Sequence, residues 1–144
     1  MAVILEISSK LLTGLFAGAM LLIATSWLPY WRSLPAGDFR PWFTANSHYL
    51  GRVMVPLGIS CTAAAAAALG YAILRDAAVA TAGLQVAALL AVLAIYFAGN
   101  KPINDRLVSD AELSDTRVKG LLRRWAVFHW VRVGLGLVAF AAAV

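Results

Sequence analysis

The hydrophobic positions of this chain fall into four long runs separated by polar segments. The runs cover residues 11–31, 53–74, 77–100 and 122–144. About 20 consecutive apolar residues are enough for a helix to cross the hydrocarbon core of a bilayer. The first three runs carry no charged side chain, and all four reach that length. The pattern predicts an all-α fold, a transmembrane four-helix bundle that forms a single domain over residues 1–144.

The connections between the predicted spans differ in length. Spans two and three are joined by little more than residues 74–77, which predicts a tight antiparallel hairpin. The other two connections, residues 30–52 and 101–124, are long and lie together on the other side of the membrane. In the first long loop, Asp38 and Pro41 predict a short interfacial helix. In the second, residues 109–112 have the form of a capping box, which predicts a helix that runs on into span four.

The basic residues are unevenly distributed between the two membrane sides. Nine lysines and arginines lie at the end with the long loops, and two lie at the other end. The positive-inside rule therefore places the long loops in the cytoplasm, and we expect an integral protein of a bacterial inner membrane. With 13% charged residues the chain is unlike a soluble domain, which averages about 25%. The net charge of +5 therefore reflects orientation, and we expect no nucleic-acid partner.

The fourth span carries a histidine and an arginine within its apolar sequence. Trp125, His129 and Arg132 are spaced i, i+4 and i+7, which places them on one stripe of one helix. An arginine in mid-membrane costs about 2.5–3.5 kcal/mol on insertion scales. All seven acids lie in or beside the predicted loops, so the cation needs a loop acid, uncharged oxygens or a negatively charged ligand. A plain alternative is that Arg132 snorkels toward the interface beside Asp105.

The end of span three supplies further polar side chains near this stripe. Gly99 and Pro102 are expected to break the helix at the membrane surface, leaving Asn100 and Asn104 close to the stripe. The alternative is an ordinary helix end followed by a turn. Aromatic side chains are dense at the same end of the predicted bundle, which predicts a flat apolar pocket. The expected ligand-binding side chains there are those of Trp42, Tyr96, Trp125 and His48.

Three short segments resemble the anthrone oxygenase-like family of small four-helix membrane proteins. They are residues 13–18 in span one, residues 100–104 after span three, and Trp125, His129 and Arg132 in span four. The resemblance implies oxygenation of an anthrone to an anthraquinone by molecular oxygen, without a known metal or flavin. The residues that it implicates are Asn100, Asn104, Trp125, His129 and Arg132.

These residues suggest a mechanism. His129 can take a proton from a polycyclic phenol or anthrone, because imidazole accepts protons near neutral pH. Arg132 can hold the resulting enolate oxygen, while Asn100 and Asn104 orient the carbonyl. Trp125 and its aromatic neighbours can stack on the flat rings. The substrate is therefore expected to be a hydrophobic aromatic small molecule.

Other functions remain open at this point. The same pocket can belong to a membrane protein that binds a quinone, a lipid or another hydrophobic molecule without chemistry. The chain can also be an accessory subunit whose Arg132 pairs with an acid of a partner. We expect no cofactor, but His48 and His129 leave haem or a copper or iron ion as an alternative. The small residues Gly14 and Gly18 can pair with a second copy, so a homo-oligomer is also open.

Overall fold

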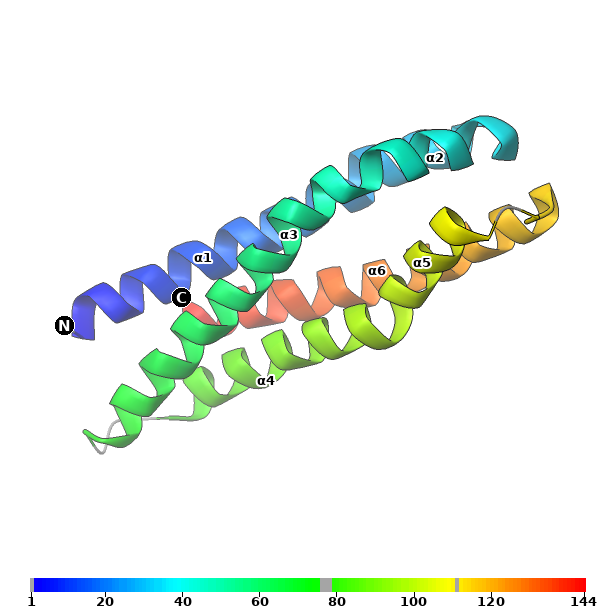
Figure 1. Ribbon diagram of the computed structural model, residues 1–144. Helices are drawn as coiled ribbons and strands as arrows, with labels where there is room; N and C mark the ends of the chain where they lie inside the picture. The colour runs from blue at the N-terminus through cyan, green and yellow to red at the C-terminus, as the bar shows by residue number, and fades with distance from the viewer. Residues whose placement is uncertain (1, 76–78, 111) are drawn as a thin grey trace.

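A computed structural model describes residues 2–75, 79–110 and 112–144, and nearly all of these residues are helical (Figure 1). The elements in chain order are α1 (Ala2–Leu22), the π-helix η1 (Ile23–Trp27), α2 (Leu28–Ser33), α3 (Ala36–Ile73), α4 (Ala80–Ile95), the π-helix η2 (Tyr96–Asn100), α5 (Lys101–Ser109) and α6 (Asp115–Ala143). Since α1, η1 and α2 join end to end, as do α4, η2 and α5, the described chain contains four long helices. All four are long and apolar enough to cross a membrane. The prediction of an all-α integral membrane protein is confirmed.

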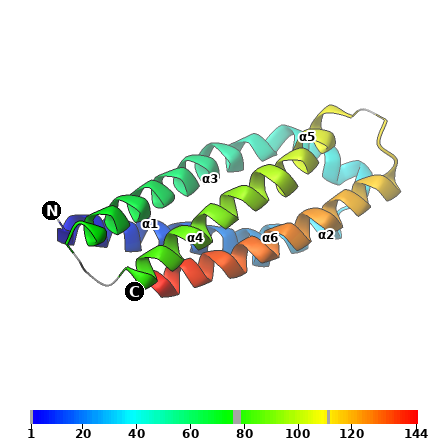
Figure 2. The same ribbon diagram turned by 90° about the horizontal axis from the view of Figure 1, so that it is seen from below.

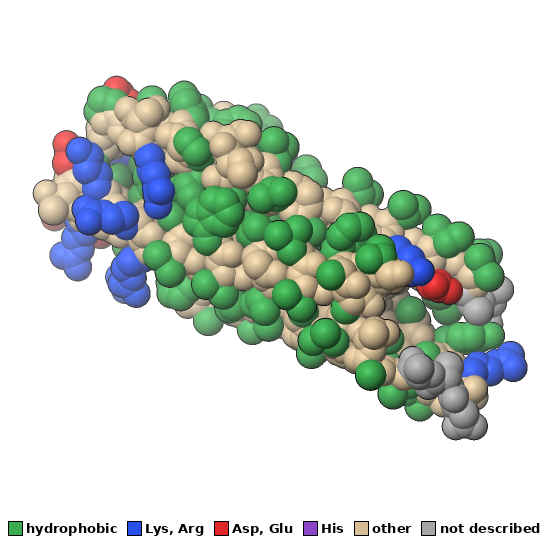
Figure 3. Space-filling model, turned by 180° about the vertical axis from the view of Figure 1, so that it is seen from behind, with side chains coloured by type: hydrophobic (Ala, Val, Ile, Leu, Met, Phe, Trp, Pro, Cys, Tyr) green, Lys and Arg blue, Asp and Glu red, His purple; other side chains and the backbone are tan. Residues whose placement is uncertain are grey.

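The four long helices pack side by side along most of their length (Figures 1 and 2). The first, α1, packs against α3 and α6, and α4 packs against the same two helices. Helices α1 and α4 therefore face each other diagonally, as do α3 and α6. Both chain ends lie opposite the end that carries α2 and α5 (Figure 1). Figure 3 shows lysine and arginine side chains gathered at the α2 and α5 end, with apolar side chains covering the middle.

The first long connection is helical, which corrects the prediction of a loop. Only residues 34–35 separate α2 from α3, and both Asp38 and Pro41 belong to α3 itself. The charges at Arg40 and Arg52 end the apolar run but do not end the helix. Phe39 and Phe43 lie one turn apart on α3 and are buried in a core cluster, so their burial stabilises the continued helix.

The predicted break at the end of span three is also wrong. The chain passes from α4 through η2 into α5 without leaving a helical path. A π-helix precedes both Pro29 and Pro102, and in each case the residue before the proline donates its N–H five residues back, to Ile23 O and Tyr96 O. Proline lacks an N–H and collides with the carbonyl four residues earlier, so a locally wider helix accommodates it. As a result, Asn100 is carried into the interior.

The second long connection begins later than predicted and contains less loop. The Ser109 hydroxyl donates to the Asp105 carbonyl, and Glu112 N–H donates to an Asp110 carboxylate oxygen, so Ser109 does not act as the expected cap. Helix α6 instead begins at Asp115 and runs on through the fourth span, as expected. The tight connection predicted for residues 74–77 lies partly outside the described residues, although α3 and α4 do pack together.

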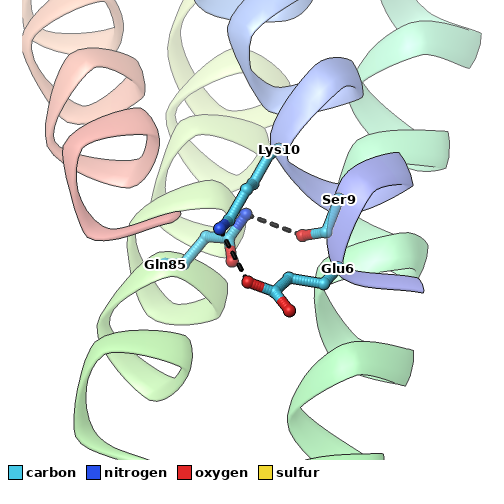
Figure 4. Close-up of polar contacts among 4 residues, drawn as sticks. All are labelled: Glu6, Ser9, Lys10 and Gln85. Carbon is cyan, nitrogen blue, oxygen red and sulfur yellow. Dashed lines mark hydrogen bonds and ion pairs between the residues drawn. The ribbon is translucent and has the colours of Figure 1, made fainter. Parts of the chain in front are cut away.

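At the end of the molecule with the two termini, polar side chains of different helices form hydrogen bonds with one another. The Gln85 side-chain nitrogen of α4 donates to Ser9 Oγ of α1 at 2.9 Å (Figure 4). It also donates to Thr13 Oγ1 of α1 at 3.0 Å. Interhelical hydrogen bonds of this kind hold membrane helices in register. The sequence leaves open that Gly14 packs against a second copy. In the structure Phe140 of α6 packs against Gly14, so this residue already makes a helix contact within the chain.

Candidate functional site

A pocket of about 410 Å³ opens between α3 and the α4–η2–α5 and α6 helices, in the half of the molecule near α2 and α5. This volume lies within the range of small-molecule sites. The wall is mostly apolar, with side chains that include Phe16, Ile23, Trp31, Phe43, Leu50, Met54, Val55, Leu93, Tyr96, Phe97, Val108 and Trp125. Its polar side chains are Ser47, His48, Asn104, Asp105, Ser109, His129 and Arg132. The pocket thus has the composition expected for an apolar ligand with a few oxygen atoms.

The stripe of α6 forms one side of this pocket. Trp125, His129 and Arg132 are all buried and all line it. The Trp125 and His129 rings stack with their centroids 4.7 Å apart and their planes inclined by 18°. This spacing follows from the helix, which puts residues four apart on the same face. The arginine therefore shares a chamber with the histidine and does not reach toward the lipid.

The tautomer of His129 follows from its one hydrogen bond. Its Nε2 lies 2.9 Å from the Met20 carbonyl oxygen of α1. Because a carbonyl only accepts, Nε2 carries the hydrogen, and Nδ1 of the neutral ring then has a free lone pair. That Nδ1 is buried and has no hydrogen-bond partner. Its lone pair makes the ring a potential general base on the pocket wall.

Arg132 is 5% exposed, and its contacts within the described residues are with uncharged groups. One guanidinium nitrogen donates to Asn100 Oδ1 at 3.4 Å, the guanidinium carbon lies 5.0 Å from the centre of the Tyr96 ring, and Nε has no partner. Asp105 lines the same pocket but pairs with Lys101 at 2.7 Å. Among the described residues no carboxylate lies within ion-pair distance of Arg132, so the alternative in which Arg132 lies beside Asp105 at the interface is not supported.

Both asparagine side chains form hydrogen bonds with Trp125 and so position helix α6, and only Asn104 also lines the pocket. Asn100 is fully buried, is not part of the wall, and donates from Nδ2 to the Trp125 carbonyl at 3.0 Å. Asn104 lines the pocket, and its Oδ1 accepts from the Trp125 indole nitrogen at 2.9 Å. Both carboxamides thus fix α6 against η2 and α5, and Asn100 also holds Arg132.

The remaining predicted residues divide between the wall and its surroundings. Tyr96 lies under the Arg132 guanidinium. His48 lines the pocket, with its ring tilted by 38° against that of Tyr49 and the centroids 3.9 Å apart. Trp42 is not among the lining residues and packs behind Trp31, with ring centroids 5.9 Å apart.

The wall also includes residues that the sequence does not point to as a site, among them Phe16 and Trp31. Phe16 lies within residues 13–18 of span one, and Trp31 is the last residue of the first apolar run. Their aromatic character was the only signal in the sequence, because the helix on which they lie reaches the pocket only through tertiary packing.

The metal alternative finds limited support in the geometry. His48 and His129 both line the pocket, but the part of the chain that the structure describes contains no group of three or more metal-ligating side chains. The nitrogen Nε2 of His129 is already engaged by the Met20 carbonyl.

The fold and the site together define an integral membrane protein whose pocket is apolar and contains a buried cation and a histidine. The model of the anthrone oxygenase family matches residues 42–142, which is most of the chain. The chain belongs to this family. The match includes Asn100, Asn104 and the α6 stripe, whereas residues 13–18 and Trp31 lie outside it. No curated protein and no solved structure matches the chain.

Proposed function

We propose that this protein is a membrane oxygenase that oxidises a polycyclic phenol or anthrone with molecular oxygen. One observation carries the proposal: on the wall of an apolar pocket lies a guanidinium that, among the described residues, has no carboxylate within ion-pair distance. One helical turn away is a histidine whose Nδ1 has no partner in the same part of the chain. A buried cation of this kind favours an anion that arrives with, or develops on, the ligand. Family membership supports the same reaction class.

The proposed reaction begins with proton removal. The flat substrate packs among the aromatic side chains, and His129 Nδ1 accepts a proton from the ring carbon whose deprotonation gives an enolate. Arg132 holds the enolate oxygen, while Asn100 keeps the guanidinium in place. Because Nδ1 is covered in the free protein, ligand binding requires the neighbouring side chains to shift.

Oxygen then reacts with the electron-rich carbon. A carbon–oxygen bond forms to give a hydroperoxide, and loss of water leaves a carbonyl. The balance is one CH₂ group and one O₂ giving one C=O group and one H₂O. The oxygen molecule takes all four electrons from the carbon, so the reaction needs no reductant and the proposal includes no cofactor.

The proposal extends to location. Basic residues gather at the α2 and α5 end, which we assign to the cytoplasmic side of a bacterial inner membrane. The pocket lies in that half of the molecule, so a hydrophobic substrate would meet the reactive groups without leaving the membrane region.

The test is oxygen uptake by the purified protein with a synthetic anthrone. Arg132→Gln should lower turnover about 10²- to 10³-fold, because it removes the charge that stabilises the anion. Arg124→Gln is the matched control, since Arg124 lies on the same helix but is exposed. Unchanged turnover in Arg132→Gln would remove the anion-holding role.

Two further measurements separate the alternatives. Wild-type protein that binds the anthrone but consumes no oxygen would contradict the oxygenase and favour a binding protein for quinones or similar molecules. Stoichiometric iron or copper, or a Soret band, in active purified protein would contradict a cofactor-free reaction.

A further inference from the structure

Three buried polar side-chain atoms lack a hydrogen-bond partner among the described residues, and all three belong to side chains that line one pocket. They are Nε1 of Trp31, Nδ1 of His129 and Nε of Arg132. The proposed function uses the histidine and the arginine. Trp31 has no role in that reaction, so its unpaired N–H needs a separate explanation.

The Trp31 ring packs among other aromatic rings on the pocket wall. The side chain is 1% exposed, and its ring meets those of Trp125 and Phe43 edge to face, with centroids 5.2 and 5.7 Å apart. A buried indole N–H normally has an acceptor, and leaving it without one costs free energy. The neighbouring Trp125 shows the ordinary case, since its indole N–H donates to Asn104.

Unpaired groups are not spread evenly through the described helices. At the end with the chain termini, the buried Gln85 nitrogen has two acceptors, Ser9 and Thr13. The unpaired atoms belong to side chains that line the pocket and are covered in the free protein, so a ligand that displaces their neighbours can provide the partner that the protein does not. Two of the three atoms are N–H donors, and the third is an acceptor.

We propose that the Trp31 indole N–H donates a hydrogen bond to a second oxygen of the substrate. This inference rests on the proposed function and narrows its substrate class. The substrate is a flat polycycle with two oxygens, one held by Arg132 and the other, a ring hydroxyl or carbonyl, by Trp31. Trp31 is then a specificity-determining residue that lies outside the segment matched by the family.

The test compares two anthrones of equal shape. One has a hydroxyl group on each of the two peri carbons, the substitutable ring positions nearest the carbonyl, and the other has methyl groups there. Affinity is measured by quenching of tryptophan fluorescence without oxygen, and KM and kcat by oxygen uptake. Trp31→Phe keeps a flat ring but removes the N–H. It should therefore weaken binding of the dihydroxy compound about tenfold and binding of the dimethyl compound less than twofold.

Trp42→Phe is the matched control, because that indole is a neighbour of Trp31 outside the pocket wall. This control variant should leave the affinity for both compounds unchanged. Equal weakening of both compounds in Trp31→Phe would indicate a structural role and overturn the inference, as would no weakening of either.

The wild-type protein provides a second measurement that does not depend on the variant folding. It should bind the dihydroxy compound about tenfold more tightly than the dimethyl compound, and equal affinities would overturn the inference. Selective binding without oxygen uptake would support the Trp31 contact while contradicting the oxygenase, so the two failures are distinguishable.

Discussion

Asn100→Asp offers a sharp test of the buried cation, because it replaces a single heavy atom, the amide nitrogen, by oxygen and keeps the side-chain shape. Asn100 Oδ1 lies 3.4 Å from a guanidinium nitrogen of Arg132, and Asn100 Nδ2 donates to the Trp125 carbonyl. The substitution places a carboxylate against the guanidinium. Arg132 then has a permanent counter-charge inside the protein and loses its capacity to hold a substrate anion.

The magnitudes favour a folded but inactive variant. Two unit charges 3.4 Å apart attract by about 5 kcal/mol at an effective dielectric constant of about 20. The lost hydrogen bond to the Trp125 carbonyl costs about 1–3 kcal/mol. The attraction offsets this loss and part of the desolvation cost of burying the carboxylate, and thermal unfolding measures the net change. Turnover should fall about 10²- to 10³-fold, as when a group that stabilises an anion is removed.

The assay pairs oxygen uptake with thermal unfolding in detergent. The control is Asn46→Asp, because Asn46 also donates from Nδ2 to a tryptophan backbone carbonyl, that of Trp42, at 2.8 Å. It loses the same type of bond without bringing a carboxylate to Arg132. Asn46→Asp should keep turnover within about twofold. Wild-type turnover in Asn100→Asp, or an equal loss in both variants, would refute the reasoning.

Two stability predictions test the packing on which the site depends. In Gly99→Ala the new methyl carbon would lie 2.9 Å from the Phe128 ring, so the free energy of unfolding should fall by about 1–3 kcal/mol. The control Gly83→Ala, which has nothing within 4 Å of the new carbon, should be neutral or stabilising. Thermal unfolding of both variants tests this prediction. Gln85→Leu should lower the free energy of unfolding by about 1–2 kcal/mol, because it removes the donor to Ser9 and Thr13. Turnover should be unchanged, because Gln85 lies away from the pocket. A matching loss of oxygen uptake would contradict this separation of stability from activity.

The helical stripe of the site was predictable because it is local. The spacing of Trp125, His129 and Arg132 places them on one face of any α-helix, whatever surrounds it. Four apolar runs of sufficient length likewise predict four membrane helices, since a bilayer leaves a lone segment few other ways to satisfy its backbone. The family could be recognised from segments around the same residues.

The continuity of the helices was not predictable from local signals. Gly99 and Pro102 favour a break, but the structure passes through them by widening to a π-helix. Phe39 and Phe43 extend α3 beyond the apolar run because a core cluster is available to bury them. Local propensity at these positions favours a helix break, whereas tertiary packing favours a continuous helix. The burial of large side chains outweighs the local preference.

The sequence by itself determined an all-helical membrane protein with a cation and a histidine on one face of its last span. Only the tertiary structure decided what those groups meet: Met20 O fixes the histidine tautomer, Asn100 holds the arginine, and Trp31 completes the wall. These contacts join residues far apart in the chain. Hydrophobic periodicity specifies which side of a helix is buried, but it does not specify which atom of another helix lies opposite.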